Sequence, residues 1–284
     1  MRLALLADIH SNYAALKACL DFLESQDIYG IAFLGDYVSD CPYPQKTMEL
    51  IYECQKKFTC WFIRGNREEY FLDYDKHKTG WKDSSNSGSL LYTYENLTER
   101  DIRFFSGLPI YQQIQLDGYP PFSICHGSPA NSREDLLPNT DVSKRYLNEL
   151  TANYLFCAHT HQYFRYSFHG KMLINCASVG APVNGQVKAQ MVIISFVDGQ
   201  WKDELISVSY DIEKIISDFD NSRLSEKAFI WAKSMIKLLR TGRNYNFECI
   251  CLAIQKAHQI DPDISAYDIP EKFWEAAAKE LSII

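Results

Sequence analysis

The sequence contains no C-x-x-C motif, no long apolar run and no excess of basic side chains. Its nine cysteines are an odd number and, apart from Cys249 and Cys251, lie far apart in the chain. Without paired cysteines, we expect reduced, mostly buried thiols and a cytoplasmic protein. The N-terminal apolar run ends at Asp8. It is too short for a signal peptide or a membrane span and predicts a buried strand.

The charge balance limits the expected partners. The chain has 36 acidic and 29 basic residues, which gives a formal net charge of −7. Nucleic-acid backbones and anionic membranes attract clustered lysine and arginine. We therefore expect no stable nucleic-acid complex and no membrane partner, and a small phosphorylated or nucleotide substrate instead.

The N-terminal part of the chain alternates between strand and helix patterns. Apolar runs at 2–7, 30–34 and 59–63 are separated by helical periodicity at 12–24 and 44–57. This order is typical of a parallel sheet covered by helices on both faces.

The pattern changes in the later part of the chain. Strand patterns follow at 110–116, 122–125, 154–157, 164–168, 172–175, 190–197 and 201–207. Helical patterns occur at 90–97, 100–105, 212–219, 224–239, 247–258 and 270–281. Asp198-Gly199 predicts a hairpin between the last two strands. We predict a domain at 1–210 with a helical extension at 211–284. The segment 68–107 is charged and aromatic, and we expect it to lie over the sheet edge or the site.

Side chains that bind metals follow the ends of the predicted strands. The seven residues are Asp8, His10, Asp36, Asn66, His126, His159 and His161. Open parallel sheets carry functional groups beyond the carboxyl ends of their strands. Residues two apart in an extended chain point the same way, so Asp8 and His10 are expected to bind one ion together. His159 and His161 have the same spacing. If these were ordinary core or loop residues, every strand end would carry a ligand type by chance.

This ligand set exceeds the needs of one ion. Three oxygen donors and four imidazoles are more than one ion with open water positions would use, whereas two ions sharing a carboxylate would use them all. Two cations about 3.5–4 Å apart lower the pKa of a bridging water and hold the attacking and leaving oxygens of a phosphoryl displacement. The sequence therefore predicts a two-metal phosphoesterase.

The ordered set, with Gly35-Asp36, Gly65-Asn66 and His159-x-His161, resembles the calcineurin-like metallophosphoesterase superfamily over about residues 1–210. The stretches 126–129 and 177–182 resemble its small bacterial and archaeal phosphodiesterase branch. The resemblance implies an α/β (α+β) fold, a four-layer αββα sandwich, here with a C-terminal helical appendage. It also implies one metal on Asp8, His10 and His161, another on Asn66, His126 and His159, and Asp36 between them.

Arg67 departs from the commoner family pattern, which has histidine after the Gly-Asn pair. Arginine is never deprotonated in proteins and cannot be a general acid. It can hold a phosphate and stabilise transition-state charge, so we expect catalytic roles for Arg67 with Asp36, Asn66 and His126. Good leaving groups should be favoured. Ala158 replaces the usual glycine before His-x-His. The turn should tolerate the added methyl group if φ of Ala158 is negative.

The predicted function is hydrolysis of phosphodiester or pyrophosphate bonds, with nucleotide-type substrates, through a metal-bridging water or hydroxide. The alternatives are a phosphomonoesterase or serine/threonine protein phosphatase, and a non-catalytic scaffold like the retromer subunit of this fold. Two divalent or transition metal ions are the expected cofactors. Mn²⁺ is the first choice, and Fe, Zn²⁺, Co²⁺ and Ni²⁺ also suit mixed oxygen and imidazole donors.

Four further features leave alternatives open. An aromatic cluster could stack a nucleobase or fill a core; its members are Trp61, Phe62, Tyr70, Phe71, Tyr74, Trp81, Tyr92 and Tyr94. The C-terminal helices are expected to serve packing or a homo-oligomer contact rather than a basic binding patch. His77 could belong to a lid over the site or be an ordinary loop residue. Asn12 could cap the N-terminus of the first predicted helix or contact a phosphate.

Overall fold

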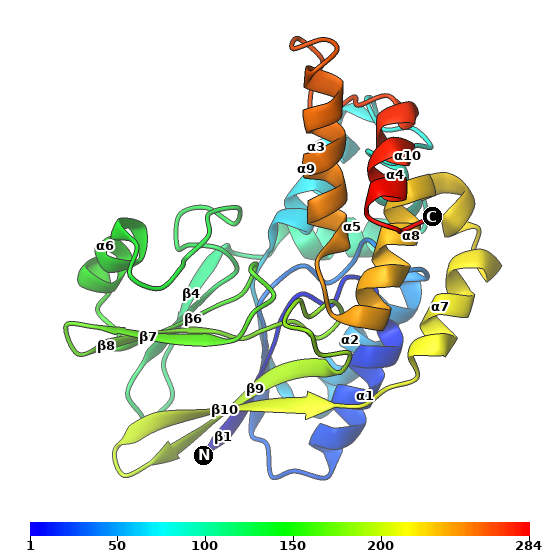
Figure 1. The fold of residues 1–284 in the computed structure, drawn as a ribbon. Helices are drawn as coiled ribbons and strands as arrows, with labels where there is room; N and C mark the ends of the chain where they lie inside the picture. The colour runs from blue at the N-terminus through cyan, green and yellow to red at the C-terminus, as the bar shows by residue number, and fades with distance from the viewer.

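Two five-stranded sheets form the centre of the computed structural model, which describes residues 1–284 (Figure 1). Their strand orders are β10-β9-β1-β2-β3 and β4-β5-β6-β8-β7. The strands are β1 (Arg2–Leu6), β2 (Gly30–Phe33), β3 (Thr59–Phe62), β4 (Tyr111–Ile114), β5 (Phe122–Cys125), β6 (Tyr154–Cys157), β7 (Phe164–Phe168), β8 (Lys171–Asn175), β9 (Ala189–Val197) and β10 (Gln200–Val208). Both sheets are mixed, with parallel β1, β2 and β3 in the first and parallel β5, β6 and β8 in the second.

Ten helices pack on the sheets or on one another. They are α1 (Tyr13–Glu24), α2 (Pro44–Lys57), α3 (Asn66–His77), α4 (Gly88–Glu95), α5 (Glu99–Ser106), α6 (Asp141–Glu149), α7 (Ile212–Asn221), α8 (Leu224–Thr241), α9 (Tyr245–His258) and α10 (Glu271–Glu280). None of them is both long enough and apolar enough to cross a membrane.

The alternation of side chains along β1 explains the layers. Leu3 and Leu5 pack into the core between the two sheets, where Phe122 of β5 also lies. Ala4 and Leu6 point to the opposite face, against α1 and α2, because successive residues of a strand face opposite sides. The helix α6 packs on the outer face of the second sheet. The order helix, sheet, sheet, helix confirms the predicted four-layer αββα sandwich.

Most predicted elements are present, and two helices were not anticipated. Asp198 and Gly199 form the expected hairpin turn, with φ of 53° and 80°. The segment 68–107 holds most of α3, together with α4 and α5. No helix was predicted at α3 because Phe71 is its only fully buried apolar side chain. The short α6 also lacked a long apolar periodicity.

The C-terminal helices α7–α10 are present as expected and pack on the sandwich. Phe219 and Ala228 share a buried cluster with Cys41 of the N-terminal part. The α4 helix begins at Gly88, where a Cβ would lie 1.9 Å from the carbonyl oxygen of Lys227. Figure 1 shows α8, α9 and α10 in yellow to red on the side of the molecule that carries α3 and α4. The domain boundary at residue 210 stays a prediction, since these helices share a core with earlier residues.

Candidate metal centre

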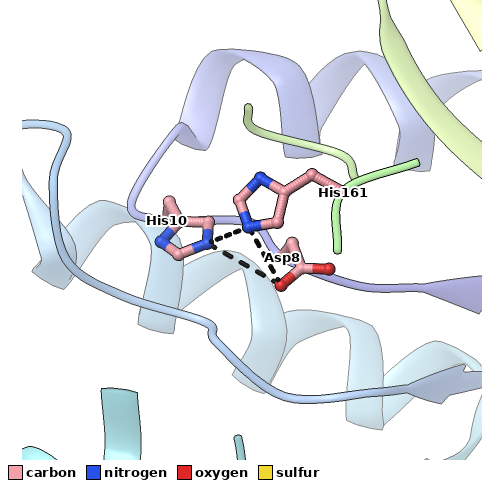
Figure 2. Close-up of side chains that lie close together, drawn as sticks. All are labelled: Asp8, His10 and His161. Atoms are coloured by element: carbon pink, nitrogen blue, oxygen red, sulfur yellow. Dashed lines mark hydrogen bonds and ion pairs between the residues drawn. The ribbon is translucent and has the colours of Figure 1, made fainter. Parts of the chain in front are cut away.

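The turn after β1 places the first group of candidate ligands. Asp8 Oδ1 lies 3.8 Å from His10 Nε2 and 3.4 Å from His161 Nε2. The Nε2 atoms of His10 and His161 are 3.1 Å apart. Figure 2 shows the three side chains pointing toward one another. They can offer one oxygen and two nitrogens to a single ion.

A turn, rather than an extended strand, brings Asp8 and His10 together. Several candidate ligands have left-handed backbone: Asp8, His10, Asp36, His159 and His161, with φ of 52°, 50°, 53°, 69° and 57°. The strand geometry expected for Asp8 and His10 is therefore wrong. Non-glycine residues seldom adopt such angles, and they gather where function requires an unusual turn. Ala158 keeps a negative φ, as its methyl group requires.

The second group of candidate ligands forms at the end of β5. His126 Nε2 lies 3.5 Å from Asp36 Oδ2 and 3.8 Å from Asp8 Oδ1. Asp36 Oδ2 is also 3.7 Å from His10 Nε2, so this carboxylate lies between the two histidines. The predicted bridging role of Asp36 remains a prediction. Asp8 belongs to both groups, so it too could contact both ions.

Asn66 and His159 complete the predicted set at its outer side. Asn66 Oδ1 lies 3.1 Å from His126 Nε2. The rings of His126 and His159 are 5.2 Å apart. His159 Nε2 faces Asp135, whose Oδ1 is 3.7 Å away, and the side chain of His159 is 23% exposed. Six of the seven residues thus converge closely, and His159 lies at the edge of the group.

Hydrogen bonds fix the orientation of the imidazoles. His126 Nδ1 lies 2.7 Å from the carbonyl oxygen of Leu34. His161 Nδ1 lies 2.7 Å from the carbonyl oxygen of Ala181. A carbonyl oxygen requires the proton on Nδ1. This leaves the Nε2 lone pair free for a metal, as in most metal sites.

The buried charges fit a bound cation. Asp8 is fully buried, and its Oδ1 has no hydrogen-bond partner although it faces the Nε2 atoms of His10, His126 and His161. A buried carboxylate oxygen without a partner is costly, and a metal ion would compensate it. Burial opposes the charged form of His10, yet neighbouring carboxylates outweigh it and raise the pKa of His10 to about 9. The cluster therefore attracts positive charge.

Glu68 holds the two strand-end turns together. Its fully buried carboxylate accepts hydrogen bonds from the backbone N–H groups of Asp36, Tyr37 and Gly65, each at 2.9 Å. Burial, followed by repulsion from Asp36, raises the pKa of Glu68 to about 7. Sequence reasoning missed this residue. Its place at the third position of α3 is a known capping signal that could have identified it.

Arg67 lies beside the metal candidates and is held by Asp40. Its Nη2 is 3.0 Å from Asp40 Oδ2, and its Nε is 3.9 Å from Asp36 Oδ2 and has no hydrogen-bond partner. Asp40 also contacts Nδ1 of His10 at 3.1 Å and accepts a 2.8 Å hydrogen bond from Trp231 Nε1. No local sequence pattern identifies Asp40 or Trp231, because the two residues meet across 191 positions of the chain.

A cavity of about 260 Å³ opens over these residues. Its lining includes Arg67 and five of the seven candidate ligands, all but the fully buried Asp8 and His126, and residues of α8 and α9 such as Trp231, Met235 and Ile250. The C-terminal helices are therefore part of the wall of the site. A molecule bound at the ligand cluster would contact both parts of the chain.

Comparisons with known proteins agree with this geometry. The family model "Calcineurin-like phosphoesterase" matches residues 1–163. An uncharacterized protein of Methanocaldococcus jannaschii is 28% identical over 244 residues, which cover 79% of this chain and 94% of that protein. A metallophosphoesterase from Sphaerobacter thermophilus is similar in structure, with a TM-score of 0.66 and 21% identity over 85% of this chain and 100% of that one. A hypothetical protein from Pyrococcus horikoshii has a TM-score of 0.72 and 24% identity, covering 85% and 98% of the two chains.

Proposed function

The chain belongs to the calcineurin-like phosphoesterase family, and from this premise we propose that it hydrolyses phosphodiester or pyrophosphate bonds in nucleotide-type substrates. Membership and the buried Asp/His cluster make it a metal-dependent phosphoesterase. The choice of bond is our inference. The observation that carries it is the position of Arg67, a permanent cation where a proton donor would otherwise act.

The residues suited to hold two metal ions are those at the strand ends. Asp8, His10 and His161 would hold one ion, Asn66, His126 and His159 the other, and Asp36 would contact both. Such ions supply positive charge to phosphoryl oxygens and acidify a water for attack. Mn²⁺ is the ion we propose, because the donors mix carboxylate, amide and imidazole groups.

Arg67 binds and orients the phosphate in this proposal. Asp40 holds the Nη2 end of its guanidinium group, and the backbone N–H of Arg67 donates to Asp36 Oδ1 at 2.8 Å. The Nε–H is buried without a partner, but the side chain as a whole is 19% exposed and lines the cavity. Its donors that face the cavity can therefore bind phosphoryl oxygens and stabilise the charge that grows there in the transition state.

The leaving group must depart without a proton from Arg67, since guanidinium does not titrate in proteins. Aryl oxides and the phosphates of an anhydride are stable anions and leave readily. Alkoxides are not. This favours activated diesters and pyrophosphate bonds over alkyl phosphomonoesters such as phosphoserine, and it argues against the protein phosphatase alternative.

The test compares a diester, a monoester and anhydrides. Metal-stripped protein is assayed on bis-p-nitrophenyl phosphate, p-nitrophenyl phosphate and a panel of dinucleoside polyphosphates, before and after Mn²⁺ is added. We expect Mn²⁺-dependent turnover that favours the diester or the anhydrides. A preference for the monoester would support a phosphatase, and metal binding without turnover on any substrate would support a scaffold.

A further inference from the structure

A second cavity, of about 580 Å³, lies beside the cavity over the metal candidates. The two cavities share Asp40, Arg67, Trp231 and Ile250 in their walls. They are therefore neighbours rather than separate features. A substrate whose phosphate lies at Arg67 could extend its remaining part into the larger cavity.

Aromatic side chains from two parts of the chain line this larger cavity. Tyr70, Tyr74 and Trp81 come from α3 and the loop after it, and Trp231 and Tyr267 come from the C-terminal segment. Tyr74 and Trp81 stack with ring centroids 4.0 Å apart and planes within 3°, which fixes the orientation of this wall. Tyr267, which also lines the cavity, is 92% exposed. A large side chain with no packing role in the fold is available there to cover a ligand.

The charge of the lining indicates what the cavity can hold. Arg67 is its only lysine or arginine and lies at the end shared with the metal candidates. The remaining polar groups include Asp73, His77, Asn86 and Ser87, which can exchange hydrogen bonds but do not form an anion site. The cavity therefore suits a flat, uncharged group with several donors and acceptors rather than a second phosphate or an acidic peptide.

We propose that this cavity binds the nucleoside part of a nucleotide ester whose phosphate lies at Arg67, an inference that rests on the proposed function. Base faces stack on aromatic side chains, while the polar groups contact the base edge or the sugar. The C-terminal segment then has a role in substrate recognition through Trp231 and Tyr267. The aromatic cluster singled out in the sequence divides accordingly, with Tyr70, Tyr74 and Trp81 at the cavity.

The experiment uses two diesters that share a leaving group. The p-nitrophenyl ester of thymidine 5′-monophosphate and methyl p-nitrophenyl phosphate differ only in carrying a nucleoside or a methyl group. We expect the Mn²⁺-loaded protein to prefer the nucleoside ester by about tenfold or more in kcat/KM, from the usual value of base–aromatic stacking. Tyr267→Ala should lower that ratio by about tenfold. Tyr29→Ala, which changes another exposed tyrosine outside both cavities, should leave the ratio unchanged.

A binding measurement separates this inference from the proposed function. Metal-free protein is titrated calorimetrically with thymidine 5′-monophosphate and with methyl phosphate, so that no turnover is needed. Tighter binding of the nucleotide, weakened by Tyr267→Ala, supports the nucleoside site even if neither diester is hydrolysed. Equal binding of the two ligands, or hydrolysis of both diesters at equal kcat/KM, would overturn the nucleoside site, while Mn²⁺-dependent hydrolysis of either diester would still support the proposed choice of bond.

Discussion

The side chains of Arg67 and Asp40 form an ion pair with 3.0 Å between Nη2 and Oδ2, and both lie largely buried beside the candidate metal ligands. The same carboxylate contacts His10 and Trp231. One acidic side chain therefore contacts the proposed phosphate-binding group, an imidazole of the candidate metal cluster and a side chain in the cavity wall. Asp40 is a positioning residue in this account.

Asp40→Asn tests this role. The substitution keeps the shape of the side chain but removes the charge that pairs with Arg67 and His10. We expect a loss of about 10- to 100-fold in Mn²⁺ affinity or in kcat, the usual cost of removing an outer partner of a metal ligand. Asp117→Asn is the matched control, an exposed aspartate in the turn between β4 and β5. Wild-type values of both quantities in Asp40→Asn would contradict the role.

Arg67→Ala should separate metal binding from catalysis. Arg67 is not a predicted ligand, so the bound Mn²⁺ should be unchanged, while kcat on bis-p-nitrophenyl phosphate should fall by about 10²- to 10³-fold. Arg133→Ala is a suitable control because both guanidinium groups lie over the Tyr70 ring, 5.9 Å from its centroid for Arg67 and 4.5 Å for Arg133, while Arg133 is more exposed. A fall in metal content that accounts for the whole loss would contradict the proposed role of Arg67.

Glu68→Ala should destabilise the fold itself. The substitution leaves three buried backbone N–H groups without an acceptor. Each such group costs about 1–3 kcal/mol, so we expect the free energy of unfolding to fall by about 3 kcal/mol or more. Glu68→Gln keeps a carbonyl oxygen and should lose less. Denaturant titrations of the metal-free proteins give the comparison, and equal stability of wild type and Glu68→Ala is the result that counts against it.

Much of the fold follows from the sequence because its cause is local. The apolar runs of β1 and β2 and the hairpin at Asp198-Gly199 are recorded in neighbouring residues, as are the periodic helices α8 and α9. The helix α3 was missed because it buries few apolar side chains. Its start is determined instead by Glu68, whose carboxylate accepts from the Gly65 N–H.

The candidate site was predictable only where ligand types follow strand ends. Asp8, His10 and Asp36 were found in this way. The contacts of Asp40 with Trp231, and of His159 with Asp135, depend on packing between distant segments. No local pattern records them. The left-handed backbone at Asp8 and His10 is likewise imposed by hydrogen bonds of Ile9 and His10 to the Asp36 carbonyl oxygen.

Gly88→Ala should weaken the contact between α4 and the C-terminal helices. A Cβ at this position would lie 1.9 Å from the carbonyl oxygen of Lys227, so α4 and α8 would have to separate. We expect a loss of about 1–3 kcal/mol in the free energy of unfolding, as for other overpacked contacts. Gly107→Ala is the control, because its nearest atoms would be 3.6 Å from the new Cβ. Equal effects of the two substitutions on thermal unfolding would refute the close packing of α4 on α8.

We propose that the Asp/His cluster holds two metal ions with Asp36 between them. The most direct measurement is the number of Mn²⁺ ions retained per chain after metal-stripped protein is reconstituted and desalted, for wild type and for Asp36→Asn. We expect two ions in wild type and the loss of both in Asp36→Asn, because each ion would lose a ligand. Wild-type protein that retains no Mn²⁺, or Asp36→Asn that retains both ions, would contradict it.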